Sequence, residues 1–203
     1  MQMRYATDLS AEQYILTEAW KEAKLDSCPT HPQEGCGFGK NGTYSRKYPQ
    51  GAKVARWYCA KGHQTFSLLP DCLSSRLSGS LNEVESIILE VEKSPSQERA
   101  ADKIRIDIEL PGALRWIRRR LKPVQSSLAM LIELMPCLFS QCLPTICSFR
   151  SVLCVEPVLA ELRSCADLYL HLLPPPVGFG PRIEPKKFKK NHFQHKTGTD
   201  PPL

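Results

Sequence analysis

The sequence predicts an α+β protein in which a small β unit is followed by a mainly α-helical region and a disordered basic tail. Glycines interrupt residues 28–67 and helix formers are scarce there, which favours short strands. From Leu68 onward apolar residues recur at helical spacing. A run of three prolines ends the last periodic segment, and the lysine-rich stretch after it has too little apolar surface to fold. We therefore divide the chain into a helical lead-in at 1–26, the β unit at 27–70, the helical region at 71–173 and the tail at 174–203.

Local signals place the first elements. Ser10 is a favourable N-cap for a helix over Ala11–Lys24, because its hydroxyl can accept a hydrogen bond from a free N–H of the first turn. Two short runs then have strand character, Gly42–Lys47 and Val54–Cys59. They predict a β unit with few aliphatic residues of its own.

Helical patterns fill most of the chain after the β unit. Ser80 and Glu83 form a capping box at the start of the first helix. Pro111 suits the first turn of a later helix, and Pro136 is expected to kink another. The expected helices are Leu81–Lys93, Gln97–Ile108, Gly112–Lys122, Val124–Leu143 and Val158–Leu172.

The composition argues against a membrane-spanning or secreted protein. The hydrophobic content of 42% is enough for a core, but no apolar run reaches the roughly 18–20 residues that a membrane helix needs. Polar residues follow Met1-Gln2-Met3-Arg4-Tyr5, so a secretory signal peptide is not indicated. We expect a cytoplasmic protein, and in that compartment nine cysteines do not indicate disulfides, because thiols are kept reduced.

Five residues that commonly bind metals fall close together in the sequence, at Cys28, His31, Cys36, Cys59 and His63. They form two groups on either side of the predicted strands, and zinc is usually held by two ligands from each of two tight turns. A short unit with little apolar core also needs the folding energy that a metal supplies. We expect Zn²⁺ bound by Cys28, Cys36, Cys59 and His63, with His31 able to replace Cys36. The alternative is a set of reduced buried thiols and surface histidines.

The other six cysteines lack this spacing. Free cysteine behaves as a small apolar residue, so we expect them in the core or at incidental positions. They are Cys72, Cys137, Cys142, Cys147, Cys154 and Cys165. A second metal site would have to come from the closely spaced cysteines at 137, 142 and 147, whose pattern does not favour one.

Four short motifs follow one another through the β unit. They are Cys28-Pro29, Gly39-Lys40-Asn41-Gly42-Thr43-Tyr44, Arg56-Trp57-Tyr58-Cys59 and His63-Gln64-Thr65-Phe66-Ser67. Together they resemble the zinc ribbon at the N-terminus of insertion-sequence transposases, over about a fifth of the chain. The resemblance implies a DNA-binding zinc ribbon with ligands at Cys28, Cys36, Cys59 and His63. The chain departs from the family pattern in its wider first knuckle and in the Cys-x3-His spacing of the second.

Basic residues are concentrated in two stretches. Residues 115–122 hold five positive charges and no negative one, and residues 182–196 hold five net positive charges, whereas the whole chain carries +6. Such patches favour a polyanionic partner. A solvated helix face and a solubilising tail would give the same composition.

In the transposase family a helix-turn-helix follows the ribbon, and residues 81–122 could supply one here. The segment Leu114–Arg120 resembles its recognition helix, with Trp116 and the arginines directed outward. Arginine suits this role because its planar fork binds phosphates and guanine edges, although a surface helix would also carry such arginines. We expect double-stranded DNA as the partner. The residues expected to contact it are Lys40, Arg46, Lys47, Lys53, Arg56, Arg115, Arg118, Arg119, Arg120 and Lys122.

These features predict a zinc-dependent DNA-binding protein, either a transposon-associated accessory or a transposase remnant, and not an enzyme. No Asp/Glu triad on strands is visible, and the glutamates at 83, 85, 90 and 92 are expected to face solvent. His171 lies at a helix end and is expected to be structural, and no glycine cluster has the ending of a phosphate loop. The alternative is a zinc-stabilised interaction module whose apolar helices at 124–172 bind a protein partner or a second copy of the chain.

Overall fold

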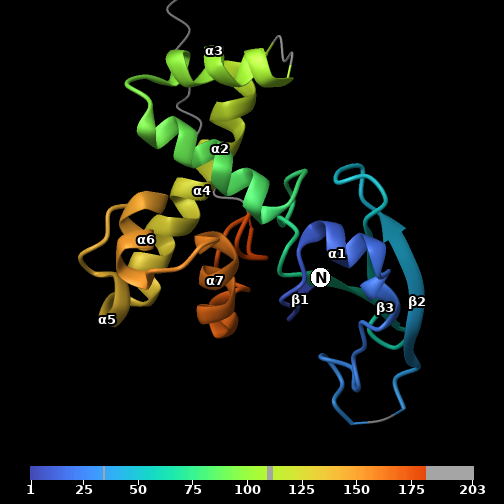
Figure 1. Ribbon diagram of the computed structural model, residues 1–203. Helices are drawn as coiled ribbons and strands as arrows, with labels where there is room; N and C mark the ends of the chain where they lie inside the picture. The colour runs from blue at the N-terminus through green and yellow to red at the C-terminus, as the bar shows by residue number, and fades with distance from the viewer. Residues whose placement is uncertain (34, 109–111, 182–203) are drawn as a thin grey trace, which may run out of the picture.

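A computed structural model describes residues 1–33, 35–108 and 112–181 and has the α+β architecture that the sequence predicts. Figure 1 shows the sheet and helix α1 on one side and helices α2 to α7 on the other. The C-terminal end of the described chain lies between these two regions, beside α7. The order of the two regions along the chain confirms the predicted fold class.

The sheet has four strands in the order β1-β4-β3-β2. Their bounds are β1 Gln2–Tyr5, β2 Phe38–Ser45, β3 Lys53–Cys59 and β4 Gln64–Pro70. Strands β2, β3 and β4 form an antiparallel meander, and β1 adds to β4 in parallel. The two predicted strands correspond to parts of β2 and β3. Strands β1 and β4 were not predicted, and the buried run at the end of β4 resembles the start of a helix.

The N-terminal helix is shorter than expected. Helix α1 covers Ala11–Leu16 and begins with a capping box of Ser10 and Gln13, which confirms the predicted cap. It ends before Glu18, whose φ of 52° is left-handed, and the 3₁₀ helix η1 follows at Ala19–Lys21. Tyr14 and Trp20 from these turns pack with apolar residues of the sheet.

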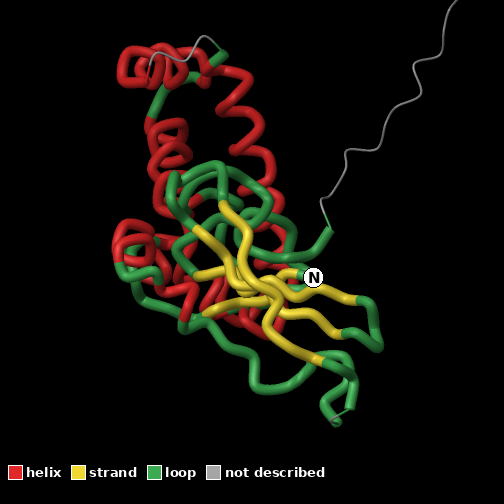
Figure 2. The backbone as a smooth tube through the Cα atoms, turned by 90° about the vertical axis from the view of Figure 1, so that its right-hand side faces the viewer, coloured by secondary structure: helices red, strands yellow, loops and turns green. Residues whose placement is uncertain are grey.

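The helical region contains six α-helices and a 3₁₀ helix among the described residues. Their bounds are α2 Leu81–Lys93, α3 Gln97–Ile108, α4 Ala113–Leu134, α5 Pro136–Phe139, α6 Ile146–Leu153, α7 Val158–Cys165 and η2 Asp167–Tyr169. Figure 1 shows helix α3 lying across one end of α2 and α4, and in Figure 2 this end of the molecule is at the top, away from the strands. The described helices include none with the length and apolarity required to cross a bilayer.

Helix α4 is longer than the sequence suggested. The predicted separation into helices at 112–122 and 124–143 is wrong, because α4 runs through Pro123 and ends at Leu134. A proline inside a helix costs roughly 3 kcal/mol. One continuous buried stripe offsets this cost, since each large apolar side chain contributes about 1.5–3 kcal/mol when buried. The stripe consists of Ile117, Leu121, Val124, Leu128 and Leu131.

Two glutamates of α2 hold the N-termini of other helices. Glu85 accepts hydrogen bonds of 2.9 and 2.8 Å from the first two N–H groups of α7. Glu92 accepts bonds of 2.8 and 2.9 Å from the first two N–H groups of α6. A carboxylate at this position satisfies free N–H groups and interacts favourably with the helix dipole. The expectation that Glu85 faces solvent is therefore wrong, since its side chain is buried.

A buried arginine joins the two regions. The guanidinium of Arg163, on α7, is fully buried and donates five hydrogen bonds of 2.7–3.3 Å to backbone carbonyls. The acceptors come from the end of the sheet and from the C-terminal segment, at Pro70, Asp71, Leu73, Pro176 and Val177. Nearby, Arg4 of β1 pairs with Asp71 at 2.8 Å and with Asp167 at 3.3 Å.

The first residues of the predicted tail are part of the folded structure. Pro174 to Gly178 are buried, and Ser127 of α4 donates hydrogen bonds of 2.8 and 3.1 Å to the carbonyls of Pro174 and Pro175. Phe179 packs against the apolar residues of both regions. The expected boundary at residue 174 is wrong because these prolines supply carbonyls that Ser127 and Arg163 require. Residues 182–203 lie outside the described structure.

We predict that Arg163→Met lowers the free energy of unfolding by at least about 3 kcal/mol, because several buried carbonyls would lose their donors. Urea denaturation followed by far-UV circular dichroism measures this. Arg99→Met is the matched control, since Arg99 is exposed and should change the free energy by less than about 0.5 kcal/mol. Equal stability of the two variants would contradict the role assigned to Arg163.

Candidate metal centre

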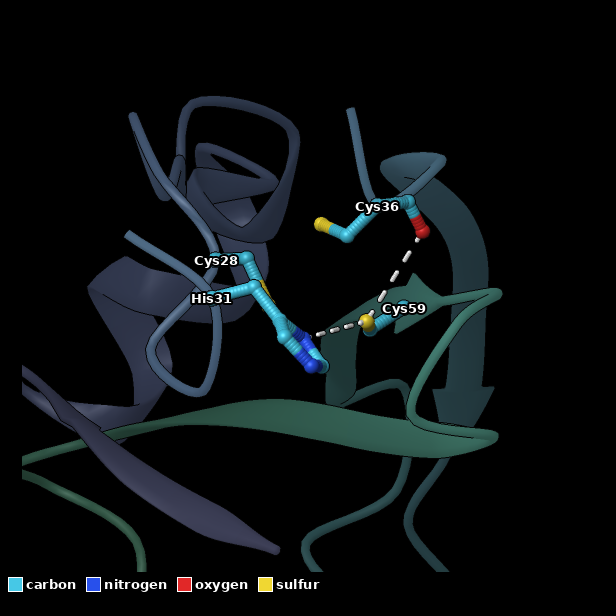
Figure 3. Close-up of side chains that lie close together, drawn as sticks. All are labelled: Cys28, His31, Cys36 and Cys59. Atoms are coloured by element: carbon cyan, nitrogen blue, oxygen red, sulfur yellow. Dashed lines mark hydrogen bonds between the residues drawn. The ribbon is translucent and has the colours of Figure 1, made fainter. Parts of the chain in front are cut away.

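Four side chains with metal-binding atoms converge beside the sheet. They belong to Cys28, His31, Cys36 and Cys59, and their ligand atoms all lie within 4.8 Å of one another. Figure 3 shows the four side chains directed toward a common point. Cys28, His31 and Cys36 come from the loop before β2, and Cys59 is the last residue of β3. Two chain segments therefore contribute to one site.

The separations fit a tetrahedral zinc site. His31 Nδ1 lies 3.3 Å from the Cys59 Sγ atom and 3.9 Å from the Cys28 Sγ atom. Zinc bonds of about 2.0–2.3 Å place neighbouring tetrahedral ligand atoms about 3.5–3.8 Å apart. The three cysteines are buried and the histidine is half-buried, as is usual for a structural site closed to solvent. Three thiolates and one imidazole form a ligand set that zinc commonly accepts.

Backbone contacts hold the two ligand loops together. The Lys61 N–H donates to the Cys36 carbonyl at 3.0 Å, and the Gly62 N–H donates to Cys59 Sγ at 3.3 Å. A Cβ at Gly62 would lie 3.2 Å from His31 Cε1 and 3.4 Å from Cys59 Sγ. A glycine at this position lets the backbone approach the thiolate and leaves room for the imidazole. The loop after β3 is thus shaped around the cluster.

Aromatic side chains close the inner side of the site. The three cysteines pack with Phe66, and the rings of Phe38 and Trp57 stack with centroids 5.4 Å apart beside it. An apolar surrounding of this kind excludes water, which strengthens the attraction between a cation and the thiolates. It also supplies the limited apolar core of this part of the chain.

The environments of two of the thiols affect their protonation differently. Burial acts to raise the pKa of Cys28, but hydrogen bonds from His31 and from backbone N–H groups outweigh it and lower the pKa to about 6. Burial and the neighbouring thiols Cys59 and Cys28 raise the pKa of Cys36. Of these two thiols, Cys28 is therefore the better prepared to bind a metal as a thiolate at neutral pH.

Three of the four ligands predicted as the first choice lie together in the cluster. Cys28, Cys36 and Cys59 meet as expected, but the histidine beside them is His31, which joins Cys36 rather than replacing it. His63 is exposed, has a left-handed φ of 46°, and its Nδ1 lies 3.2 Å from the Tyr58 hydroxyl. The Cys28-x2-His31 spacing was the available signal for this histidine. Within the described residues, the cysteines at 137, 142 and 147 do not belong to a cluster of side chains that could bind a metal ion.

The basic residues predicted in the β unit have varied surroundings. Arg46 donates bonds of 2.9 and 2.6 Å to the carbonyls of Ser74 and Leu77, so it holds a loop of the protein itself. Lys40 donates to the Lys21 carbonyl at 3.2 Å, and the ammonium of Lys53 lies 5.7 Å from the centre of the Trp20 ring. Lys47 is exposed and Arg56 is half-buried.

On α4 the five predicted basic residues fall into two groups. Arg115, Arg119 and Lys122 are exposed and form no ion pair with the described residues. Arg118 pairs with Glu98 of α3 at 3.4 Å, and Arg120 covers the ring of Trp116 at 3.7 Å from its centre. Trp116 is half-buried under this cation instead of facing fully outward.

Comparisons with protein-family models, with curated proteins and with solved structures found no match to this chain. The arrangement of the four side chains therefore carries the chemical interpretation of the site.

We predict that His31→Ala lowers zinc affinity by more than about 100-fold, because it removes a direct ligand. Loss of a residue that only hydrogen-bonds to a ligand costs about 10–100-fold. His63→Ala is the matched control and should bind zinc like the unmodified protein. Competition with a chromophoric chelator gives the affinities, and Co²⁺ spectra report the ligand geometry. Loss of zinc in His63→Ala with retention in His31→Ala would restore the ligand set inferred from the sequence.

We predict different alkylation profiles for two thiols of the metal-free protein, because the thiolate is the reactive form. With a pKa of about 6, Cys28 should approach its full rate with iodoacetamide by neutral pH, and the rate should fall as the pH drops through 6. The raised pKa of Cys36 should keep its rate rising well above neutral pH. Peptide mass mapping across a pH series measures both, and coincident profiles would contradict the assignment.

Proposed function

We propose that this protein is a metal-stabilised DNA-binding protein whose N-terminal β unit is a zinc ribbon. The observation that carries the proposal is the cluster of Cys28, His31 and Cys36, from the loop before β2, with Cys59 at the end of the antiparallel strand β3. Zinc held between two chain segments that adjoin paired strands is typical of zinc ribbons. The resemblance to insertion-sequence transposases favours DNA as the ligand of this unit, and a transposon-associated accessory or a transposase remnant as the biological context.

The basic surface of α4 supports DNA as the partner. The helix is seated by its buried apolar stripe, which leaves Arg115, Arg119 and Lys122 exposed. Exposed cations on one helix attract the phosphate backbone of DNA at long range and contact it at short range. We assign the predicted helix-turn-helix to α2, α3 and α4, and the connection at 109–111 lies outside the described residues.

We propose no catalytic step for this protein. The glutamates at 83, 85, 90 and 92 are each engaged by groups of the protein itself. Carboxylates that hold two catalytic metals need free oxygens directed into a common site. Within the described residues the candidate metal cluster contains thiols and an imidazole only, which suits a structural ion.

A protein-interaction module is the second candidate. Most large apolar residues of 124–172 face the protein's own core, which leaves less surface for a partner than the sequence suggested. The observation in its favour is a small set of exposed apolar side chains at Leu138, Leu143, Val152, Leu168 and Leu172. They belong to several elements, so the DNA-binding proposal has the stronger support.

The proposal is tested by fluorescence anisotropy of a labelled DNA duplex over a salt series. We predict binding whose affinity falls with salt, with a logarithmic slope of about −0.9 for each phosphate contacted. The triple variant Arg115→Ala, Arg119→Ala, Lys122→Ala should bind at least about tenfold more weakly and with a smaller slope.

The double variant Lys24→Ala, Lys93→Ala is the control, because both lysines are exposed and lie outside α4. Its affinity for the DNA duplex should be much higher than that of the triple variant. Absence of DNA binding by the unmodified, zinc-loaded protein would refute the proposal. Self-association or capture of a specific protein in its place would support the interaction module.

A further inference from the structure

Three arginines from two helices line one hollow at the free end of the helical region. Arg105 comes from α3, and Arg115 and Arg118 come from the first turns of α4. Among the described residues, the hollow has a volume of about 560 Å³ and is completed by Gly112 and Leu114. Figure 1 shows α3 lying across this end of α4, so the site is at an extremity of the molecule.

Among the described residues, the arginines of the hollow outnumber the carboxylates that pair with them. Arg118 pairs with Glu98 at 3.4 Å, and Arg105 pairs with Asp102 at 3.7 Å. Arg115 has no acidic partner among the described residues. Of the three described arginines two have a carboxylate partner, so Arg115 is available to a phosphodiester group.

The two ion pairs are of the kind that a stronger anion can displace. All four side chains are more than half exposed, at 58% and 63% for Arg118 with Glu98 and 51% and 65% for Arg105 with Asp102. Exposed pairs contribute only about 0–1 kcal/mol. A phosphate offers several oxygens to planar guanidinium groups and can be held by two or three of them together. The carboxylates then serve to keep the arginines extended along the helices in the free protein.

We propose that this hollow binds one phosphate group of the DNA backbone through Arg105, Arg115 and Arg118. The inference rests on the proposed DNA-binding function and adds a residue to it, since Arg105 lies on α3 and outside the basic run of α4. A phosphate held between two helices fixes the position of both on the duplex, whereas cations on one helix alone leave the orientation open.

The test compares two arginines of α3 in the full-length, zinc-loaded protein. Arg105→Ala should weaken binding of a DNA duplex by about tenfold and reduce the salt slope by about 0.9, because one phosphate contact is lost. Arg99→Ala removes the same charge from an exposed position of α3 that does not line the hollow. It should weaken binding by less than about threefold. Equal effects of the two variants would overturn the proposal.

A second pair of variants tests whether DNA affinity can be increased at this site. Glu98→Gln releases Arg118 from its carboxylate and should strengthen DNA binding, whereas Glu133→Gln, on a distant part of α4, should leave it unchanged. Weaker DNA binding by Glu98→Gln would count against the site.

Competition by inorganic phosphate is a second test. Replacing chloride by phosphate at constant ionic strength should inhibit DNA binding by the unmodified protein more than DNA binding by Arg105→Ala. Equal inhibition of the two would overturn the assignment to this hollow. If the unmodified protein does not bind DNA, the proposed function fails; if it binds and Arg105 behaves like Arg99, only the hollow fails.

Discussion

The buried guanidinium of Arg163 is the interaction on which the rest of the fold depends. Removing a cation from water costs several kcal/mol, so a charge at this depth persists only where its donors are satisfied. Here carbonyls from the end of β4 and from the C-terminal segment accept all of its assigned bonds. Burial lowers the pKa of Arg163 to about 10, which still leaves the side chain charged at neutral pH. The same cation therefore fixes α7, the sheet end and residues 176–177 relative to one another.

Two negatively charged side chains of α2 position other helices of the helical region. Glu85 and Glu92 are two turns apart on one side of α2, and each binds the N-terminus of a different helix. These contacts determine where α7 begins, and through α7 they determine where Arg163 lies. The buried polar groups of this protein thus form a sequence of dependent contacts, from α2 to α7 and from α7 to the sheet. Apolar packing supplies the energy of the region, and these charges specify its arrangement.

The sequence was sufficient where the determining contacts are local. The predicted N-cap at Ser10 and the predicted capping box at Ser80 involve residues three apart, and both are present. All four clustered metal-binding residues were among the five that spacing indicated, although His63 and not His31 was the first choice. The partner of Glu85 lies 73 residues away and one acceptor of Arg163 lies 93 residues away, so no local pattern could indicate them. The choice between His31 and His63 depended in the same way on how the loop before β2 folds back over the end of β3.

The metal centre and the arginine hollow are structurally separate, and this separation limits which part of the protein a bound metal can stabilise. The cysteines pack in a small cluster with Phe66 of β4, whereas α2 to α7 share a different and larger apolar core. Strand β4 connects the two, since it carries Phe66 near one end and the Arg163 acceptor Pro70 at the other. A metal bound at the cysteines would therefore stabilise the β unit and leave the arrangement of α3 and α4 to their own packing. If the β unit and the basic helices both contact DNA, the Arg163 junction is what sets the spacing between them.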